Sequence, residues 1–197
     1  QLAHDYRYEQ STIQAGFVPL SGGARQRLKL EISYIERVAI LGREDRPLPV
    51  PGQEKPLPIS TYRLEELAST KLRALYGRRK GRDIYDLFHI GAFPLDERAV
   101  RKLTLYYFYH AKMIFHYPSF RANVEEKMRQ RGFVDDVRGL IRLGQGFDWG
   151  QACQRVLDRF AFLGDLDERD HLFLELAGHL LQKPIPERSK ELVQQIE

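Results

Sequence analysis

The stretch that decides the fold is KLRALYGRRKGRDIYDLFHI, residues 71–90, in which a lysine, a glycine and an Arg-Asp pair follow one another. Between Thr61 and Tyr76, apolar residues recur at steps of three and four, which predicts one buried face of an α-helix; they are Leu64, Leu67, Ala68, Leu72 and Leu75. Lys71 falls near the centre of this stripe, and the opposite, solvated side is predicted to carry Glu66, Thr70 and Arg73. A charge at a buried position favours a helix that handles an anion, such as a nucleotide phosphate. The alternative is a lysine that lays its stem along apolar surface and extends its ammonium to water.

A second helix is predicted after Gly77, with a buried side made by Ile84, Leu87, Phe88 and Gly91. Two arginines and two aspartates lie along one flank of it at helical spacing: Arg79, Arg82, Asp83 and Asp86. Taken alone, this cluster would be a ladder of surface ion pairs, each of little value to stability. Beside Lys71, across a short turn, it predicts a helical hairpin that brings cations and carboxylates to one cleft.

A strand is predicted upstream of the hairpin, in RLKLEIS at residues 27–33. Apolar residues alternate there with Lys29, Glu31 and Ser33, which is typical of a half-buried strand. The SGGA sequence at residues 21–24 predicts a hairpin loop before it. The alternation places Glu31 on the face opposite the apolar residues, where it would point either into a cleft or to water.

Proline and helical periodicity organise the rest of the chain. Five prolines between Gly42 and Ser60 predict a connector, with room for an edge strand. Helices are then predicted from Asp96 to about Phe115 and over residues 121–143, 148–162 and 167–182. Aromatic residues surround the first of these helices, which favours a central packed helix over a platform for stacking bases.

Residues 63–87, RLEELASTKLRALYGRRKGRDIYDL, resemble the signature segment of the AbiEii/AbiGii nucleotidyltransferase toxins. In that family a Leu-Glu-Glu start, a Lys and a closing Arg-Asp-x-x-Asp recur in this order, and the RLKLEIS strand is similar to the one that precedes them. The resemblance implies an α+β fold, a polymerase-β-like nucleotidyltransferase remnant whose mixed or antiparallel sheet is followed by a helical C-terminal part. We expect three parts, namely a strand-rich part, a motif helix hairpin and a helical domain, at residues 1–60, 61–93 and 94–197.

The resemblance also implies a function. Members of the family are toxins of type IV toxin-antitoxin or abortive infection systems, and they transfer nucleotides from an NTP to RNA, notably tRNA, with Mg²⁺. By position, Lys71 matches the motif lysine that contacts nucleotide phosphate, and Asp83 and Asp86 match the closing aspartates. Glu31 takes the place of the acidic residue on the central strand, as a catalytic and metal residue, and Arg79 and Arg82 are assigned to nucleotide binding. The expected partners are an NTP, RNA or tRNA, and a cognate antitoxin.

One family motif is missing from this sequence. A Gly-Ser or Gly-Gly turn followed by an Asp-x-Asp pair should precede the RLKLEIS strand, but Gly22 and Gly23 are followed by ARQRLKL without an aspartate. Metal-dependent nucleotidyl transfer needs such carboxylates. We interpret the chain as a fragment, because it opens within strand-like sequence. The alternative is a degenerate, nonenzymatic helical module that binds nucleic acid or an antitoxin.

Composition sets broader limits. The formal net charge of +4 is compatible with a nucleic-acid partner without indicating one. The single cysteine, Cys153, excludes an internal disulfide and favours a reducing cytosol, and therefore a cytoplasmic protein. No apolar run approaches the length that crosses a membrane. The histidine spacings match no zinc-protease motif, and neither a Walker loop nor a Gly-x-Ser-x-Gly elbow is present, so the sequence supports no hydrolase.

Overall fold

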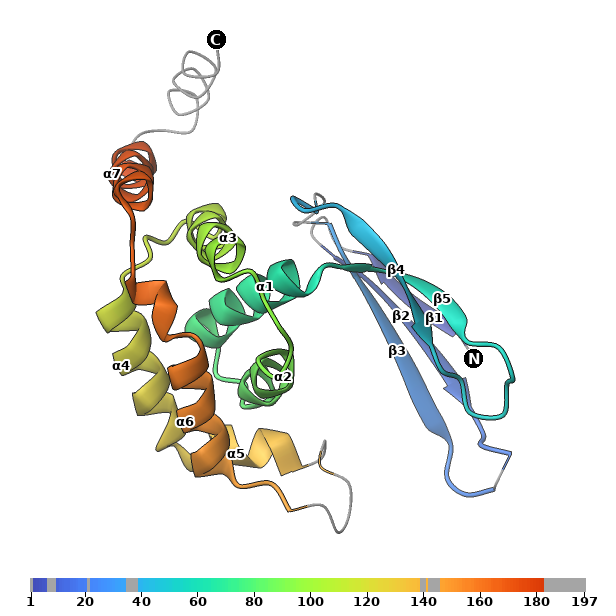
Figure 1. Cartoon of the computed structure of the whole chain (residues 1–197). Helices are drawn as coiled ribbons and strands as arrows, with labels where there is room; N and C mark the ends of the chain where they lie inside the picture. The colour runs from blue at the N-terminus through green and yellow to red at the C-terminus, as the bar shows by residue number, and fades with distance from the viewer. Residues whose placement is uncertain are drawn as a thin grey trace. The chain divides into compact units, whose positions relative to one another are not determined.

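The computed structural model describes residues 2–6, 10–20, 22–34, 39–138, 141 and 146–182 of the chain. Its elements divide into two compact units, Gln1–Gly42 and Arg43–Glu197. Strands come first along the chain and helices follow, as the colours of Figure 1 show. The predicted α+β class is confirmed.

The N-terminal unit is an antiparallel sheet of three strands, β1 (Leu2–Tyr6), β2 (Gln10–Phe17) and β3 (Gln26–Ser33), in the order β1-β2-β3. Strands β2 and β3 pair from Phe17 opposite Gln26 onward, so the predicted strand and hairpin are confirmed. Gly22 and Gly23 in the connecting loop have φ angles of 77° and 112°. Side chains rarely tolerate such angles, which explains a glycine pair at this turn.

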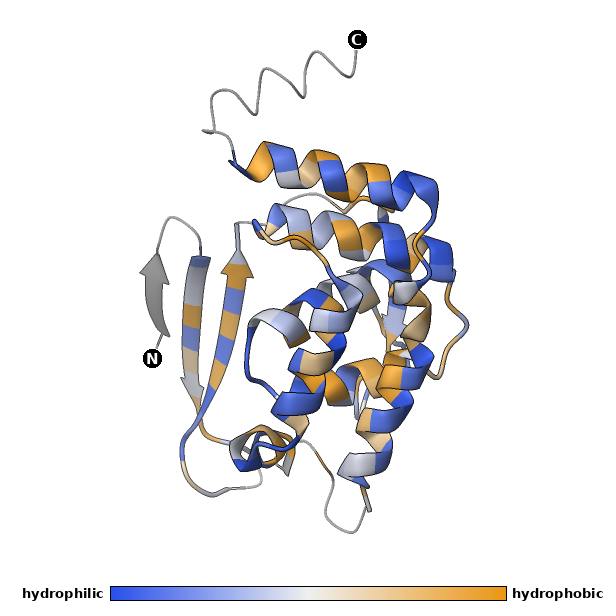
Figure 2. Cartoon of the chain, turned by 90° about the vertical axis from the view of Figure 1, so that its left-hand side faces the viewer, coloured by the Kyte–Doolittle hydropathy of each residue, from blue (hydrophilic) through white to orange (hydrophobic). Residues whose placement is uncertain are grey.

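Strand β3 is more exposed than its sequence predicts. Its eight residues are all exposed, and the apolar side chains of Leu28, Leu30 and Ile32 are 63%, 53% and 40% exposed. The prediction of a half-buried strand was therefore wrong in this respect. The alternation itself is real, and Figure 2 shows hydrophobic and hydrophilic residues succeeding one another along the strands. A face becomes buried through packing between layers, and the described residues of this unit form one sheet without a helix.

The proline-rich connector forms a hairpin of its own. Strands β4 (Arg43–Leu48) and β5 (Leu57–Tyr62) pair antiparallel, with Pro47 opposite Pro58. Both strands of a two-stranded sheet are edges, where a residue without an N–H is tolerated. The prediction of one edge strand thus understated what this segment forms.

The other elements that the structure describes in the second unit are helices. Their bounds are α1 (Leu64–Gly77), α2 (Arg82–Ile90), α3 (Glu97–His110), α4 (Tyr117–Met128), α5 (Arg131–Arg138), α6 (Trp149–Arg159), the short 3-10 helix η1 (Ala161–Gly164) and α7 (Glu168–Gln182). Helix α1 packs against α2, α3 and α4, while α2 packs against α6 and α3 against α7. Asp96 caps α3, as expected, because its side chain accepts a hydrogen bond from the Ala99 N–H.

Two predicted helices end earlier than expected. The helix expected to reach Phe115 ends at His110, shortly before Lys112, whose φ of 60° no α-helix contains. Residues 121–143 hold the end of α4 and all of α5 rather than one helix, and residues 139–140 and 142–145 lie outside the described part. The break lets α5 approach α2 closely: a Cβ on Gly81 would lie 1.9 Å from the Phe133 carbonyl oxygen. Gly81 is therefore required at the start of α2 by the packing of α5.

The core of the second unit is aromatic at its centre. Phe108 stacks edge-on against Phe115 with ring centroids 5.0 Å apart, and Tyr76 of α1 lies 5.2 Å from Phe108. This confirms α3 as a packed, central helix. Cys153 is fully buried, and burial raises the pKa of its thiol to about 12, so the group acts as a small apolar side chain. Within the described residues, no helix combines the length and apolarity needed to span a membrane.

Candidate functional site

Lys71 lies on α1 with its side chain 29% exposed and its ammonium directed at α2. Its Nζ is 2.5 Å from Oδ2 of Asp86 and 3.8 Å from Oδ1 of Asp83. The lysine is thus held between two carboxylates fifteen and twelve residues downstream. Neither an isolated buried charge nor a lysine that simply reaches for water describes it, and the structure brings Lys71 together with Asp83 and Asp86 across the turn between the two helices, as the hairpin prediction expected of these three residues.

Asp83 is fixed in place by an arginine. Its side chain is fully buried, and Arg78 donates to both of its oxygens, from Nε at 2.8 Å and from Nη2 at 2.7 Å. Two parallel bonds between a guanidinium and a carboxylate set both groups in one orientation. The hydrogen bond to Asp83 raises the pKa of Arg78. Asp83 is therefore a buried carboxylate with a fixed orientation near Lys71, and not a member of a series of surface ion pairs.

Asp86 differs from Asp83 in its access to solvent. Its side chain is 35% exposed, and Lys71 holds it through Oδ2. A partly exposed ion pair can exchange one partner for another at little cost, because water screens both charges. Lys71 thus has one partly exposed partner, Asp86, and one buried partner, Asp83, which Arg78 holds in place.

The arginine contacts differ from those expected. Arg79 and Arg82 are exposed, and the backbone N–H of Arg82 donates to Asp136 at 3.3 Å. Arg78, which sequence reasoning left out, makes the bidentate contact instead. Its position in the sequence could have indicated this contact, because Arg78 is the C-cap residue of α1 and lies in the turn that leads to α2.

Glu66 is a second correction. It was expected on the solvated side of α1, but it is fully buried, and the Tyr107 hydroxyl of α3 donates to its Oε1 at 2.5 Å. The physical reason is that α1 packs on several helices at once, so the side opposite Lys71 is also covered. A buried carboxylate needs hydrogen-bond donors, and Tyr107 supplies one.

Glu31 lies in the N-terminal unit, on β3, with its side chain 51% exposed. Its Oε1 accepts from Gln10 Nε2 at 2.9 Å and lies 2.7 Å from Lys29 Nζ. These neighbours give it the contacts of a strand glutamate among polar side chains. Its catalytic and metal roles stay predictions.

The described acidic residues do not form a magnesium site by themselves. No group of three or more His, Cys, Asp or Glu side chains among them is placed to hold a metal ion. Both oxygens of Asp83 are bonded to Arg78, and Asp86 is bonded to Lys71. Mg²⁺ usually takes one or two free carboxylates together with phosphate oxygens. The expected Mg²⁺ therefore stays a prediction of the resemblance.

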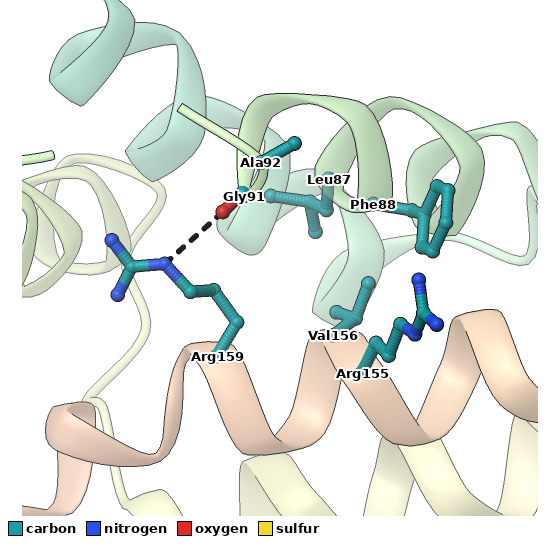
Figure 3. A pocket seen from close by; sticks show the side chains of 7 residues that line it. All are labelled: Leu87, Phe88, Gly91, Ala92, Arg155, Val156 and Arg159. Atoms are coloured by element: carbon teal, nitrogen blue, oxygen red, sulfur yellow. Dashed lines mark hydrogen bonds between the residues drawn. The ribbon is translucent and has the colours of Figure 1, made fainter. Parts of the chain in front are cut away.

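A separate apolar cavity of about 270 Å³ lies between α2 and α6. Leu87 of α2 and Val156 of α6 point toward each other, and Arg155 and Arg159 of α6 lie on either side of them (Figure 3). The Arg155 guanidinium lies 5.8 Å from the Phe88 ring centroid, and Arg159 Nε donates to the Gly91 carbonyl at 3.2 Å. Arg159 also pairs with Glu97, so it is largely committed to joining α6 to the end of α2 and the start of α3.

Comparison with known proteins agrees with the sequence pattern. Residues 2–153 match the family described as nucleotidyl transferase AbiEii toxin, type IV TA system. Among curated proteins none is significantly similar in sequence.

Two solved structures share the fold. The nucleotidyltransferase toxin MenT4 from Mycobacterium tuberculosis H37Rv is 18% identical, with a TM-score of 0.65 over 88% of this chain and 62% of MenT4. JHP933 from Helicobacter pylori is 16% identical, with a TM-score of 0.54 over 89% of this chain and 68% of JHP933. The chain thus spans less than two thirds of the length of MenT4.

Proposed function

The chain belongs to the AbiEii family of nucleotidyltransferase toxins of type IV toxin-antitoxin systems, and on this premise we propose that it transfers a nucleotide from an NTP to RNA. The observation that carries the proposal is Lys71, held between a buried, fixed Asp83 and a partly exposed Asp86. A cognate antitoxin would be its partner in the cell, and tRNA is the acceptor that we favour.

Lys71 would act on the phosphates of the NTP. An incoming phosphate replaces Asp86 as the partner of the ammonium, which exchanges one anion for another, while Asp83 stays bound to Arg78. In the transfer step, the acceptor hydroxyl oxygen bonds to the α-phosphorus, the bond to the bridging oxygen breaks, and pyrophosphate leaves. A positioned ammonium stabilises the negative charge that develops on these oxygens.

Asp86 would then have a second role. Once Lys71 turns to phosphate, the Asp86 carboxylate loses its cation and becomes able to accept the proton of the acceptor hydroxyl. The partial exposure of Asp86 is consistent with contact to a substrate, whereas the full burial of Asp83 is not. Asp83 is accordingly a positioning residue.

The test uses the complete coding sequence. We expect Lys71→Gln to lose NTP binding, measured with a fluorescent NTP analogue, and to lower labelling of RNA 3′ ends by about 100-fold or more. Lys55→Gln, in the exposed turn between β4 and β5, removes the same charge and serves as the control. Full labelling by Lys71→Gln would refute the phosphate role. A wild-type protein that binds RNA in a salt-sensitive way and labels nothing would instead support a nonenzymatic nucleic-acid-binding module.

A further inference from the structure

A second basic site lies at the C-terminal end of α1, where α4 crosses it. A polar cavity of about 200 Å³ is lined there by Arg78, Arg79, Asn123, Glu126, Lys127 and Gln130. Arg78 belongs both to this cavity and to the bidentate pair with Asp83. The cavity is therefore next to the Lys71 cluster and shares one side chain with it.

Lys127 is the unusual group in this cavity. It is 5% exposed, and its Nζ donates to the carbonyl oxygens of Leu75 and Tyr76, both at 2.6 Å. These bonds stabilise the end of α1, where carbonyls lack partners within the helix. An ammonium has three donors, however, and no carboxylate of the described residues forms an ion pair with Lys127.

The charge of Lys127 is only partly compensated. Burial and the neighbouring Arg79 lower the pKa of Lys127 to about 8, although the charges of Asp83 and Glu126 act in the opposite direction. A buried cation beside an arginine is stabilised when a further anion joins it. The site therefore favours a ligand of negative charge, and Glu126 is the one acidic side chain at its wall.

Asn123 indicates more about that ligand. Its Oδ1 is buried without a hydrogen-bond donor among the described residues. An amide oxygen needs a donor, which the phosphodiester group of a nucleic-acid backbone does not bring but a ribose hydroxyl does. Phosphate and hydroxyl together are the chemistry of a ribonucleotide unit.

We propose that the Lys127 cavity binds one phosphate and its ribose in the backbone of the acceptor RNA strand, beside the Lys71 site. This inference rests on the proposed function. The cavity would hold the strand while its reacting end reaches the NTP at Lys71, and Arg78 would couple the two positions.

Single substitutions in α4 and just after its C-terminal end test this proposal in the complete protein. Gln130→Glu adds a negative charge at the cavity wall, and we expect it to weaken binding of a short single-stranded RNA about three- to tenfold at low salt. Glu126→Gln removes a negative charge there and should tighten binding by a similar factor. Glu125→Gln is the matched control: the same change on the same helix, at a residue that pairs with Arg121 outside the cavity. Fluorescence anisotropy of labelled RNA measures all three.

Two further comparisons show whether the phosphate bound in the cavity belongs to the acceptor RNA or to the NTP. NTP affinity should stay the same in Gln130→Glu and Glu126→Gln, and a DNA strand of equal sequence should bind less tightly than RNA. Changes in NTP affinity without changes in RNA affinity would overturn the assignment to the acceptor strand. Equal effects of Glu125→Gln and Glu126→Gln, equal binding of DNA and RNA, or no RNA binding would also overturn it. If the wild-type protein labelled no RNA while Gln130→Glu still weakened RNA binding and Glu126→Gln still tightened it, the proposed function would fail and the cavity would remain an RNA-binding site.

Discussion

Lys71 of α1 and Asp86 of α2 form an ion pair with both side chains partly open to solvent, at 29% and 35% exposure. Asp83, three residues earlier on α2, is completely buried and bonded to Arg78. The same helix thus presents one aspartate that can exchange partners and one that cannot. In the proposed function, Lys71 and Asp86 would meet the substrate, and Asp83 would orient Lys71.

The two aspartates should therefore respond differently to the same substitution. Asp83→Asn leaves Arg78 facing a neutral amide at a buried position, and we expect it to lower the free energy of unfolding by about 2 to 4 kcal/mol. Asp86→Asn breaks a partly solvated pair and should change it by less than about 1 kcal/mol. Urea denaturation of both variants measures the difference, and equal losses would contradict the distinction. Transfer activity should fall in the stable Asp86→Asn variant, which removes the proposed proton acceptor without unfolding the site.

Sequence reasoning found the parts of this site that local spacing determines. Lys71 and the two aspartates lie within one helix hairpin, so periodicity brings them together. The burial of Glu66 depends on Tyr107, which is 41 residues away, and no local pattern reports that packing. The exposure of β3 is another case, since alternation predicts which residues share a face but not whether a second layer covers it.

Glu66 and Tyr107 give a prediction of their own. Tyr107→Phe removes a donor from a buried carboxylate, and we expect the free energy of unfolding to fall by about 1 to 3 kcal/mol. Tyr109→Phe, on the same helix and half-buried, deletes a hydroxyl outside this contact and should have a smaller effect. Thermal denaturation of both variants provides the comparison. If the two substitutions lowered the free energy of unfolding equally, the hydrogen bond from Tyr107 to Glu66 would contribute no more to stability than the Tyr109 hydroxyl.

The ion pairs that join α7 to α3 should weaken at low pH. Asp167 and Asp170 cap the start of α7 reciprocally, each accepting from the other's backbone N–H, at 2.8 Å and 3.1 Å. Lys102 of α3 bonds to both carboxylates, at 2.9 Å and 2.7 Å, and Arg101 bonds to Asp170. The hydrogen bond from Lys102, with the backbone N–H of Asp170, lowers the pKa of Asp167 to about 2 from 3.8.

A carboxylate with a lowered pKa in the folded state stabilises the protein above its unfolded pKa, and this contribution is lost as pH falls through the folded pKa. We therefore expect the contribution of Asp167 to be complete above about pH 4 and to vanish towards pH 2. Asp167→Asn should lower stability at neutral pH and flatten its pH dependence between pH 4 and 2, as measured by urea denaturation. Asp165→Asn, exposed and two residues earlier, is the control and should keep the wild-type slope. An unchanged slope in Asp167→Asn would show that another group governs the acid response, with Asp170, which also pairs with Lys102 and Arg101, as the next carboxylate to test.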